Sequence, residues 1–251
     1  TDAEALAALR ELSPEDIVDG FNLAALFNPT PTDKPTWAGG PMQDGEIITA
    51  TTEEALRDGN VAQVDVMVGA TSMDIGFNMF KDKAGLFASF GPYAEQAREV
   101  YDPAGDAPFQ AVGYSVGQDR SMQEPARFVA EQMTEHGKKA FYYRFGTVAE
   151  SSDSPGAPHA SDIPFFFNTV AAKYGDALTA QDAAAAETIH QYIVSFAKDG
   201  QPVSDGAVAW QAFDPAQSNM INMTRSGQME HGTDPWKARL DVVKAAVEQS
   251  N

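Results

Sequence analysis

The sequence predicts an α/β protein with a mostly parallel central β-sheet. The first observation is an unbroken apolar and aromatic run around one arginine, residues 140–145. Such a run is typical of a strand that is buried on both faces, as strands of parallel sheets are. The second observation is another apolar run, residues 61–68, and the third is a helical pattern over residues 118–136.

Composition narrows the class of protein. The chain has 251 residues, of which 43% are apolar and 21% charged, as expected for a globular chain with a sizeable core. Its net charge of −19 repels phosphate backbones and anionic lipids, so we expect neither a nucleic-acid nor a membrane partner. The chain has no cysteine, which excludes disulfides, thiolate nucleophiles and cysteine-ligated zinc. No apolar run approaches the roughly 20 residues of a transmembrane helix.

The N-terminal part is predicted to be helical and then irregular. Residues 1–27 have helical spacing, and Ser13 is placed to cap a second helix. A long loop is predicted over residues 28–46, which are rich in proline and glycine. Thr52 is expected to open a short helix that ends at Gly59.

The apolar run of residues 61–68 is predicted to be a strand that ends at Gly69. A short loop follows and carries Asp74, a titratable side chain just past a strand end. In α/β enzymes this is where chemistry is placed. The alternative is that Asp74 caps the N-terminus of a helix.

Residues 75–117 are rich in phenylalanine, methionine and glycine. Phe77, Met79 and Phe80 are candidates for the wall of a substrate pocket, although burial in the core is the alternative explanation. The helix predicted over residues 118–136 has an apolar face and a glycine stop at Gly137.

The strand at residues 140–145 is followed by a loop of serine, aspartate, glycine and proline that contains His159. A histidine in this position can be catalytic, or it can be an ordinary loop residue. Thr179 is expected to cap the longest helix, which Gly200 ends, and His190 beside its apolar face is assigned to packing or surface. A short strand at residues 220–224 and a C-terminal helix from Pro235 complete the prediction.

Gly113-Tyr-Ser115-Val-Gly117 matches the G-x-S-x-G pattern of a nucleophile elbow. An elbow requires a buried strand before the serine and a helix after it, because the strained turn must lift the hydroxyl above a sheet edge. Residues 106–112 do not form such a strand. In addition, Asp74 precedes Ser115, whereas these hydrolases have the order serine, acid, histidine. We therefore do not assign Ser115 as the nucleophile.

Several segments, in one order along most of the chain, resemble the type B carboxylesterases, the family that includes the cholinesterases. They are Pro41–Ile48, Glu54–Gly59, Val64–Asp74, Pro125–Ala130, Phe141–Phe145, Gly156–Phe167 and Phe196–Pro202 with Trp210. Several weak matches in a consistent order are far more specific than one motif. The resemblance implies an α/β-hydrolase fold, of which the chain matches the C-terminal half.

The resemblance also implies roles for individual residues. The triad histidine of the family lies in a Gly-x-x-His segment, which corresponds to His159. The triad acid lies five residues past a glycine, which corresponds to Asp74, although the family more often has glutamate followed directly by glycine. Asp162 corresponds to a second carboxylate three residues after the histidine, and Phe165 joins the candidates for the pocket wall. Neither a metal nor an organic cofactor is implied.

The serine elbow and the glycine-rich oxyanion loop of such enzymes belong to the first half, which residues 1–251 do not contain. We therefore expect a non-covalent complex with the N-terminal half of the same esterase, as a separate chain or from a nicked polypeptide. The compartment stays open, and the acidity is compatible with a secreted or periplasmic location, which we favour over the cytoplasm.

The leading hypothesis is that the chain supplies the acid and histidine of a serine ester hydrolase, whose substrate is a small carboxylic ester. The alternative from another class is a catalytically inactive, esterase-like binding or adhesion protein. A third reading is a self-contained hydrolase that uses Ser115. The sequence does not identify the ester.

Overall fold

The computed structural model describes residues 1–18 and 43–250. The chain divides into two compact units, Thr1–Asp58 and Gly59–Asn251. The predictions for the end of the first helical stretch and for most of the long loop fall within residues 19–42, outside the described residues.

The first unit contains short, capped helices. They are α1 (Asp2–Arg10), α2 (Pro14–Val18) and α4 (Thr52–Arg57). The predicted cap of α2 is confirmed, because the Ser13 hydroxyl accepts a hydrogen bond from the Asp16 amide at 3.1 Å. Helix α4 begins at Thr52, as predicted, and its N-cap is Thr51, whose side chain and that of Glu54 form a capping box.

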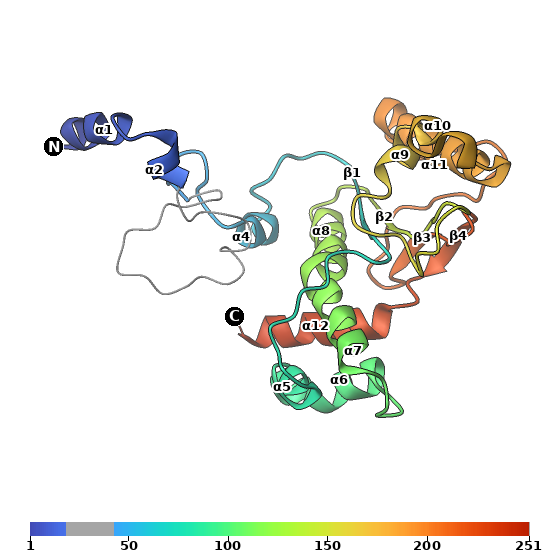
Figure 1. Ribbon diagram of the computed structural model, residues 1–251, viewed down its shortest axis with the longest axis horizontal. Coiled ribbons are helices and arrows are strands. Elements are labelled where there is room, and N and C mark those ends of the chain that lie inside the picture. The colour runs from blue at the N-terminus through green and yellow to red at the C-terminus, as the bar shows by residue number, and fades with distance from the viewer. Residues whose placement is uncertain (19–42, 251) are drawn as a thin grey trace. The chain divides into compact units, whose positions relative to one another are not determined.

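The second unit is built on a four-stranded sheet of order β1-β2-β3-β4 among the described strands. The strands are β1 (Val66–Thr71), β2 (Ala140–Phe145), β3 (Asn219–Met223) and β4 (Met229–Thr233). β1 pairs with β2 and β2 with β3 in parallel, whereas β3 and β4 are antiparallel. The mostly parallel sheet is therefore confirmed (Figure 1).

Strand β2 has the predicted bounds, and all six of its residues are buried. The prediction for β1 was wrong at both ends, because this strand begins at Val66 and continues through Gly69 to Thr71. Gly69 does not end the strand: a Cβ at this position would clash with the carbonyl oxygen and ring of Tyr143 on β2. The glycine therefore permits close approach of two strands instead of making a turn.

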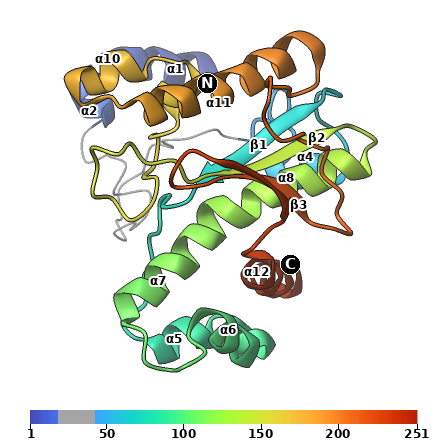
Figure 2. The ribbon, with the colours of Figure 1, turned by 90° about the vertical axis from the view of Figure 1, so that its right-hand side faces the viewer.

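Helices cover both faces of the sheet. The described helices of this unit are α5 (Lys83–Ala88), α6 (Ala94–Tyr101), α7 (Phe109–Gln118), α8 (Glu124–Glu135), α9 (Ile163–Phe166), α10 (Val170–Tyr174), α11 (Ala180–Asp199) and α12 (Lys237–Ser250). Short turns of other helix types are η1 (Gly91–Tyr93), η2 (Asp119–Gln123) and η3 (Gly175–Ala177). Figure 2 shows α11 and α8 on opposite sides of the strands.

The predicted helix limits are confirmed for α11, which Thr179 caps and Gly200 ends in the left-handed conformation at φ 70°. The helix predicted over residues 118–136 is longer than expected. It combines α7, the π-turn η2 and α8, so it starts at Phe109. The C-terminal helix starts at Lys237, two residues later than expected.

Side chains alternate along β2 and supply two cores. Phe141, Tyr143 and Phe145 pack on one face with residues of α11 and with Trp210. Ala140 and Tyr142 pack on the other face with alanines of α8. A third core joins α5, α6, α7 and α12 (Figure 1). This scaffold fixes the carboxyl ends of β1 and β2 side by side, because Thr71 is in register with Phe145.

Candidate active site

Asp74 lies in the loop that follows β1, and four donors surround its carboxylate. Oδ2 accepts hydrogen bonds from the backbone amide and the hydroxyl of Thr71, at 3.1 and 2.9 Å. Oδ1 accepts one from the Ile75 amide at 2.8 Å and is 2.6 Å from Nδ1 of His159. No helix begins at Asp74, so the alternative of an N-cap is not realised. Two oxygens with two partners each leave the carboxylate little freedom to rotate.

His159 lies in the loop that follows β2, so the structure brings the two residues together from neighbouring strand ends. An ionised carboxylate only accepts hydrogen bonds, and Nδ1 must therefore carry the proton in the 2.6 Å contact. This tautomer leaves Nε2 as an acceptor. The histidine side chain is 56% exposed and the aspartate side chain 7%, so the pair has a buried acid and an accessible base.

The hydrogen bonds keep the buried acid charged. Burial alone would raise the pKa of Asp74, but the bonds from Ile75, His159 and Thr71 outweigh it and hold the pKa below its ordinary value. A carboxylate that stays ionised at neutral pH stabilises an imidazolium formed next to it. The charge of Asp74 and its contact with Nδ1 of His159 therefore both suit a pair in which the aspartate stays ionised and the histidine takes up a proton.

Backbone contacts hold the two loops together. The Met73 amide donates to the Ala157 carbonyl at 2.9 Å, and the Ala157 amide donates to the Ser72 hydroxyl at 3.0 Å. A Cβ on Gly156 would lie 2.7 Å from Cγ of Met73, so only glycine allows this approach without a shift. Ala160, next to the histidine, has a left-handed φ of 63°, a strained conformation for a residue with a side chain.

Asp162 shares the electrostatic environment of this pair. Burial raises its pKa, and backbone amides at Asp162 and Ile163 oppose the rise. The charge of Asp74 raises the same pKa further, whereas His159 lowers it. Asp162 is therefore close enough to sense the charges of both Asp74 and His159, and its supporting role stays a prediction.

The predicted pocket residues are placed in different environments. Phe77 and Met79 are 65% and 69% exposed just past the acid, and Phe80 packs against the core of α5 to α7. Phe165 is fully buried in the main core, with its ring 5.4 Å from that of Phe145. It does not line the hollow beside His159, because α9 turns its side chain toward the sheet.

That hollow has a volume of about 650 Å³, and its lining is mostly apolar. Its lining comes from His159, Ala160, Ser161, Ile163, Pro164, Thr169, Ala172, Lys173 and Tyr174. The sequence did not identify the α9 and α10 residues of this lining as pocket residues. Their position soon after His159 was the one feature that could have indicated them. The hydroxyl of Ser161 is buried there without a hydrogen-bond partner among the described residues.

Ser115 lies inside α7, and its two neighbouring glycines have a packing role. A Cβ on Gly113 would lie 2.5 Å from the Asn78 side chain, and one on Gly117 would lie 2.5 Å from the Phe77 carbonyl. The segment after the acid therefore crosses α7 over these glycines. A serine in a helix interior, with no strand before it, lacks the geometry of a nucleophile elbow.

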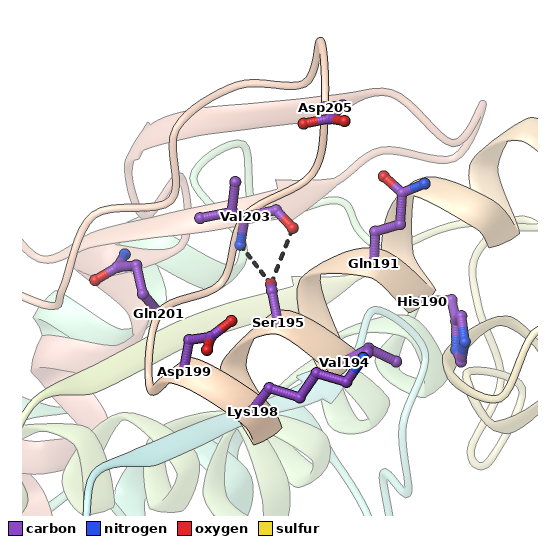
Figure 3. A pocket seen from close by; sticks show the side chains of 9 residues that line it. All are labelled: His190, Gln191, Val194, Ser195, Lys198, Asp199, Gln201, Val203 and Asp205. Carbon is purple, nitrogen blue, oxygen red and sulfur yellow. Dashed lines mark hydrogen bonds between the residues drawn. The ribbon is translucent and has the colours of Figure 1, made fainter.

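A second hollow, of about 550 Å³, lies at the C-terminal end of α11 and also includes a histidine (Figure 3). Nδ1 of His190 is 2.8 Å from the backbone carbonyl of Phe166. The Ser195 hydroxyl in this hollow bonds to the backbone of Val203, as Figure 3 shows. The histidine of this hollow thus has a neutral partner in place of a carboxylate.

The described residues 1–18 and 43–250 also bear on metal and membrane binding. Among them, no group of three or more histidine and acidic side chains is arranged to hold a metal ion. None of the helices in these ranges combines the length and apolar character needed to cross a membrane.

A parallel sheet with helices on both faces, and an acid and a histidine at adjacent strand ends, define the α/β-hydrolase class. A solved structure of PNB esterase matches the chain with a TM-score of 0.71 at 20% identity, over 95% of this chain and 50% of that one. The model of the carboxylesterase family matches residues 93–240, more than half of the chain. The chain belongs to the carboxylesterase family and has the C-terminal part of its fold.

A curated relative is the phenmedipham hydrolase of Pseudarthrobacter oxydans. It is 29% identical over 231 residues, which cover 84% of this chain and 46% of the relative. The chain thus spans about half the length of the proteins it matches.

Proposed function

We propose that this chain supplies the acid and the histidine of a serine-dependent carboxylic ester hydrolase. The observation that carries the proposal is the 2.6 Å contact between Nδ1 of His159 and Oδ1 of Asp74, with Nε2 left as an acceptor on an exposed ring. The family membership supports ester hydrolysis as the reaction class.

In this mechanism Nε2 of His159 accepts the proton of a serine hydroxyl as the serine oxygen attacks the ester carbonyl. The tetrahedral intermediate collapses to an acyl-enzyme, and the imidazolium returns the proton to the leaving alcohol. Water then attacks the acyl-enzyme with the same histidine as base. Asp74 holds the Nδ1–H tautomer throughout and stabilises the imidazolium in both steps.

The serine would come from the N-terminal half of the same esterase, as a separate chain or part of a nicked polypeptide. Two observations support this partner. β2 occupies one edge of β1, and the other edge has no strand partner among the described residues. Exposed apolar side chains lie near the pair on both loops: Phe77, Met79 and Ile163 are 65%, 69% and 53% exposed. Open strand edges and clustered apolar surface are typical of surfaces that another segment covers.

The substrate would be a small carboxylic ester with an apolar acyl or alcohol part. The apolar lining of the hollow beside His159 supports this class. Phe77, Met79 and Phe80 remain candidates for further pocket walls.

The test starts with denaturing intact-mass analysis of the purified protein, which identifies any second polypeptide. The assembled protein is then assayed with p-nitrophenyl esters of increasing acyl length and with phenmedipham, because one relative is named for that compound. Turnover that His159→Ala abolishes supports the proposal. A folded assembly without turnover on any ester would favour the inactive binding or adhesion protein.

A further inference from the structure

One continuous helical segment binds the loop that follows β1 and carries Asp74, which we call the acid loop. The hydroxyl of Tyr114 donates to the Asp74 carbonyl at 2.6 Å, and the Asp74 amide donates to Oε1 of Gln118 at 3.2 Å. The hydroxyl of Ser121 donates to the Ile75 carbonyl at 2.7 Å. These side chains come from α7 and from the π-turn η2.

The π-turn explains how a helix can contact this loop twice. In a regular α-helix, residues five apart point about 140° away from each other. A π-turn closes its hydrogen bond over five residues, so residues five apart come close to the same face. Gln118 and Gln123 are five apart across η2, and both reach the acid loop.

Gln123 is the more deeply buried of the two, at 1% exposure. Its Nε2 donates to the Thr71 carbonyl at 2.7 Å, and its Oε1 accepts from Nε of Arg144 at 3.1 Å. Arg144 offers only donors, so the orientation of the amide is fixed. Arg144 is itself held by two bonds to Asp234, at 2.7 and 3.0 Å.

Thr71 transmits this anchoring to the acid. The residue is 2% exposed, and both its amide and its hydroxyl donate to Oδ2 of Asp74. With Oδ2 pinned, rotation of the carboxylate about its χ2 bond is blocked, and Oδ1 stays directed at Nδ1 of His159. A buried chain of contacts thus runs from Asp234 through Arg144, Gln123 and Thr71 to the acid–histidine pair.

We propose that Gln123 and Thr71 are positioning residues, which orient the Asp74 carboxylate toward His159 and receive their own orientation from the buried Arg144–Asp234 ion pair. The inference rests on the proposed function for its catalytic consequence. The orientation of the Asp74 carboxylate can be tested separately from the proposed function, because the contact between Asp74 and His159 can be observed without measuring turnover.

The first test replaces Thr71 by Val, which keeps the shape and removes the hydroxyl. The readout is the downfield ¹H NMR resonance of the His159 Nδ1–H in the assembled protein, assigned by its loss in His159→Gln. We expect Thr71→Val to broaden this resonance and to speed its exchange with water about tenfold, the effect of one bond to a charged group. Thr71→Ser should restore the wild-type resonance.

The matched control is Thr147→Val. Thr147 is also 2% exposed, and its hydroxyl donates to the Thr224 carbonyl at 3.2 Å, away from the acid loop. An equal change of the resonance in Thr71→Val and Thr147→Val would overturn the proposal, since the effect would then be general loss of stability.

The second test is Gln123→Glu, which keeps the acceptor for Arg144 and removes the donor to Thr71. We expect the same broadening and faster exchange of the resonance, and in the assembled enzyme a lower kcat with unchanged KM. Gln132→Glu is the control, because Gln132 is buried on the same helical segment and bonds to Glu135. A resonance whose width and exchange rate stay at the wild-type values in both Gln123→Glu and Thr71→Val overturns the positioning role alone. A folded wild-type assembly without the resonance contradicts the acid–histidine pair itself.

Discussion

Two histidines line surface hollows of similar size in this protein, and their surroundings differ in one decisive respect. The hollows measure about 650 Å³ at His159 and about 550 Å³ at His190. In both cases an oxygen lies close to Nδ1, at 2.6 and 2.8 Å. At His159 this oxygen belongs to the buried carboxylate of Asp74, whereas at His190 it is the backbone carbonyl of Phe166.

The difference shows that the volume of a hollow does not distinguish the histidine that has a carboxylate partner from the one that does not. A carbonyl can fix the tautomer of an imidazole, but it carries no net charge and stabilises an imidazolium less than a carboxylate does. His159 also follows a strand end, where loops from neighbouring strands converge, whereas His190 lies within α11. The partner of Nδ1 and the position on the sheet together separate the two sites.

The largest expected difference between the sites is in ester turnover. His159→Ala should lower kcat/KM of the assembled enzyme by about 10⁴-fold or more, because it removes the general base. His190→Ala removes a histidine from a hollow of similar size and should change kcat/KM less than twofold. The measurement is hydrolysis of p-nitrophenyl butyrate at pH 8. Comparable losses in the two variants would contradict the distinction between the sites.

Asp74→Asn converts the charged partner of His159 into a neutral one and so makes its site resemble that of His190. We expect kcat to fall about 10³- to 10⁴-fold, because an amide can hold the wrong tautomer and does not stabilise the imidazolium. KM should change little. Circular dichroism controls for folding, and an Asn variant that retains more than a tenth of wild-type kcat would show that the carboxylate is dispensable.

Gly156→Ala tests whether close contact of the two loops matters. The added Cβ would lie 2.7 Å from Cγ of Met73 and push the histidine loop away from the acid loop. We expect about 1–3 kcal/mol of lost stability, the usual effect of overpacking, and a kcat about tenfold lower. Gly232→Ala is the matched control, since no atom lies within 4 Å of its Cβ. Equal effects of both substitutions on kcat would contradict the expectation.

The scaffold of the His159 site was largely predictable from the sequence, and its fine positioning was not. The buried strand β2, the cap and stop of α11, and the placement of Asp74 and His159 after strands follow from local patterns of burial and turn residues. The C-terminal limit of β1 was missed because a glycine after an apolar run normally signals a turn. Gly69 instead lies inside the strand, where a side chain would clash with Tyr143, a residue distant in sequence.

The contacts that orient Asp74 depend on similar long-range partners. Gln123 bonds to Thr71 across 52 positions of the chain, and no local pattern marks that pair. The π-turn that brings it there has no propensity signature either. Strand β4 was missed because it is an edge strand of mixed polarity with little apolar alternation. Sequence reasoning therefore overlooked residues whose role depends on contacts with segments that are far away in the sequence.

The pH dependence of stability should differ between the two sites. Hydrogen bonds depress the native pKa of Asp74 against the effect of burial, so its contribution to stability is present above the unfolded pKa of about 3.9. That contribution is lost as the pH falls through the lower native pKa. The carbonyl that faces His190 does not titrate. Urea unfolding of wild type and Asp74→Asn should show a stability gap at pH 6 that narrows toward pH 3, and a gap that stays constant would contradict this assignment.

The smallest expected effect concerns the serine of this chain that resembles a nucleophile. The mechanism proposed for the His159 site requires a nucleophile, and Ser115 lies inside α7, between glycines that serve helix packing. Ser115→Ala should therefore leave kcat and KM of the assembled enzyme within about twofold of wild type, since alanine is also a good helix former. A phosphonate probe that labels serine nucleophiles should leave this chain unmodified and label the N-terminal half. Modification at Ser115, together with loss of turnover in Ser115→Ala, would instead make this chain a self-contained hydrolase, with His159 acting on a serine of its own.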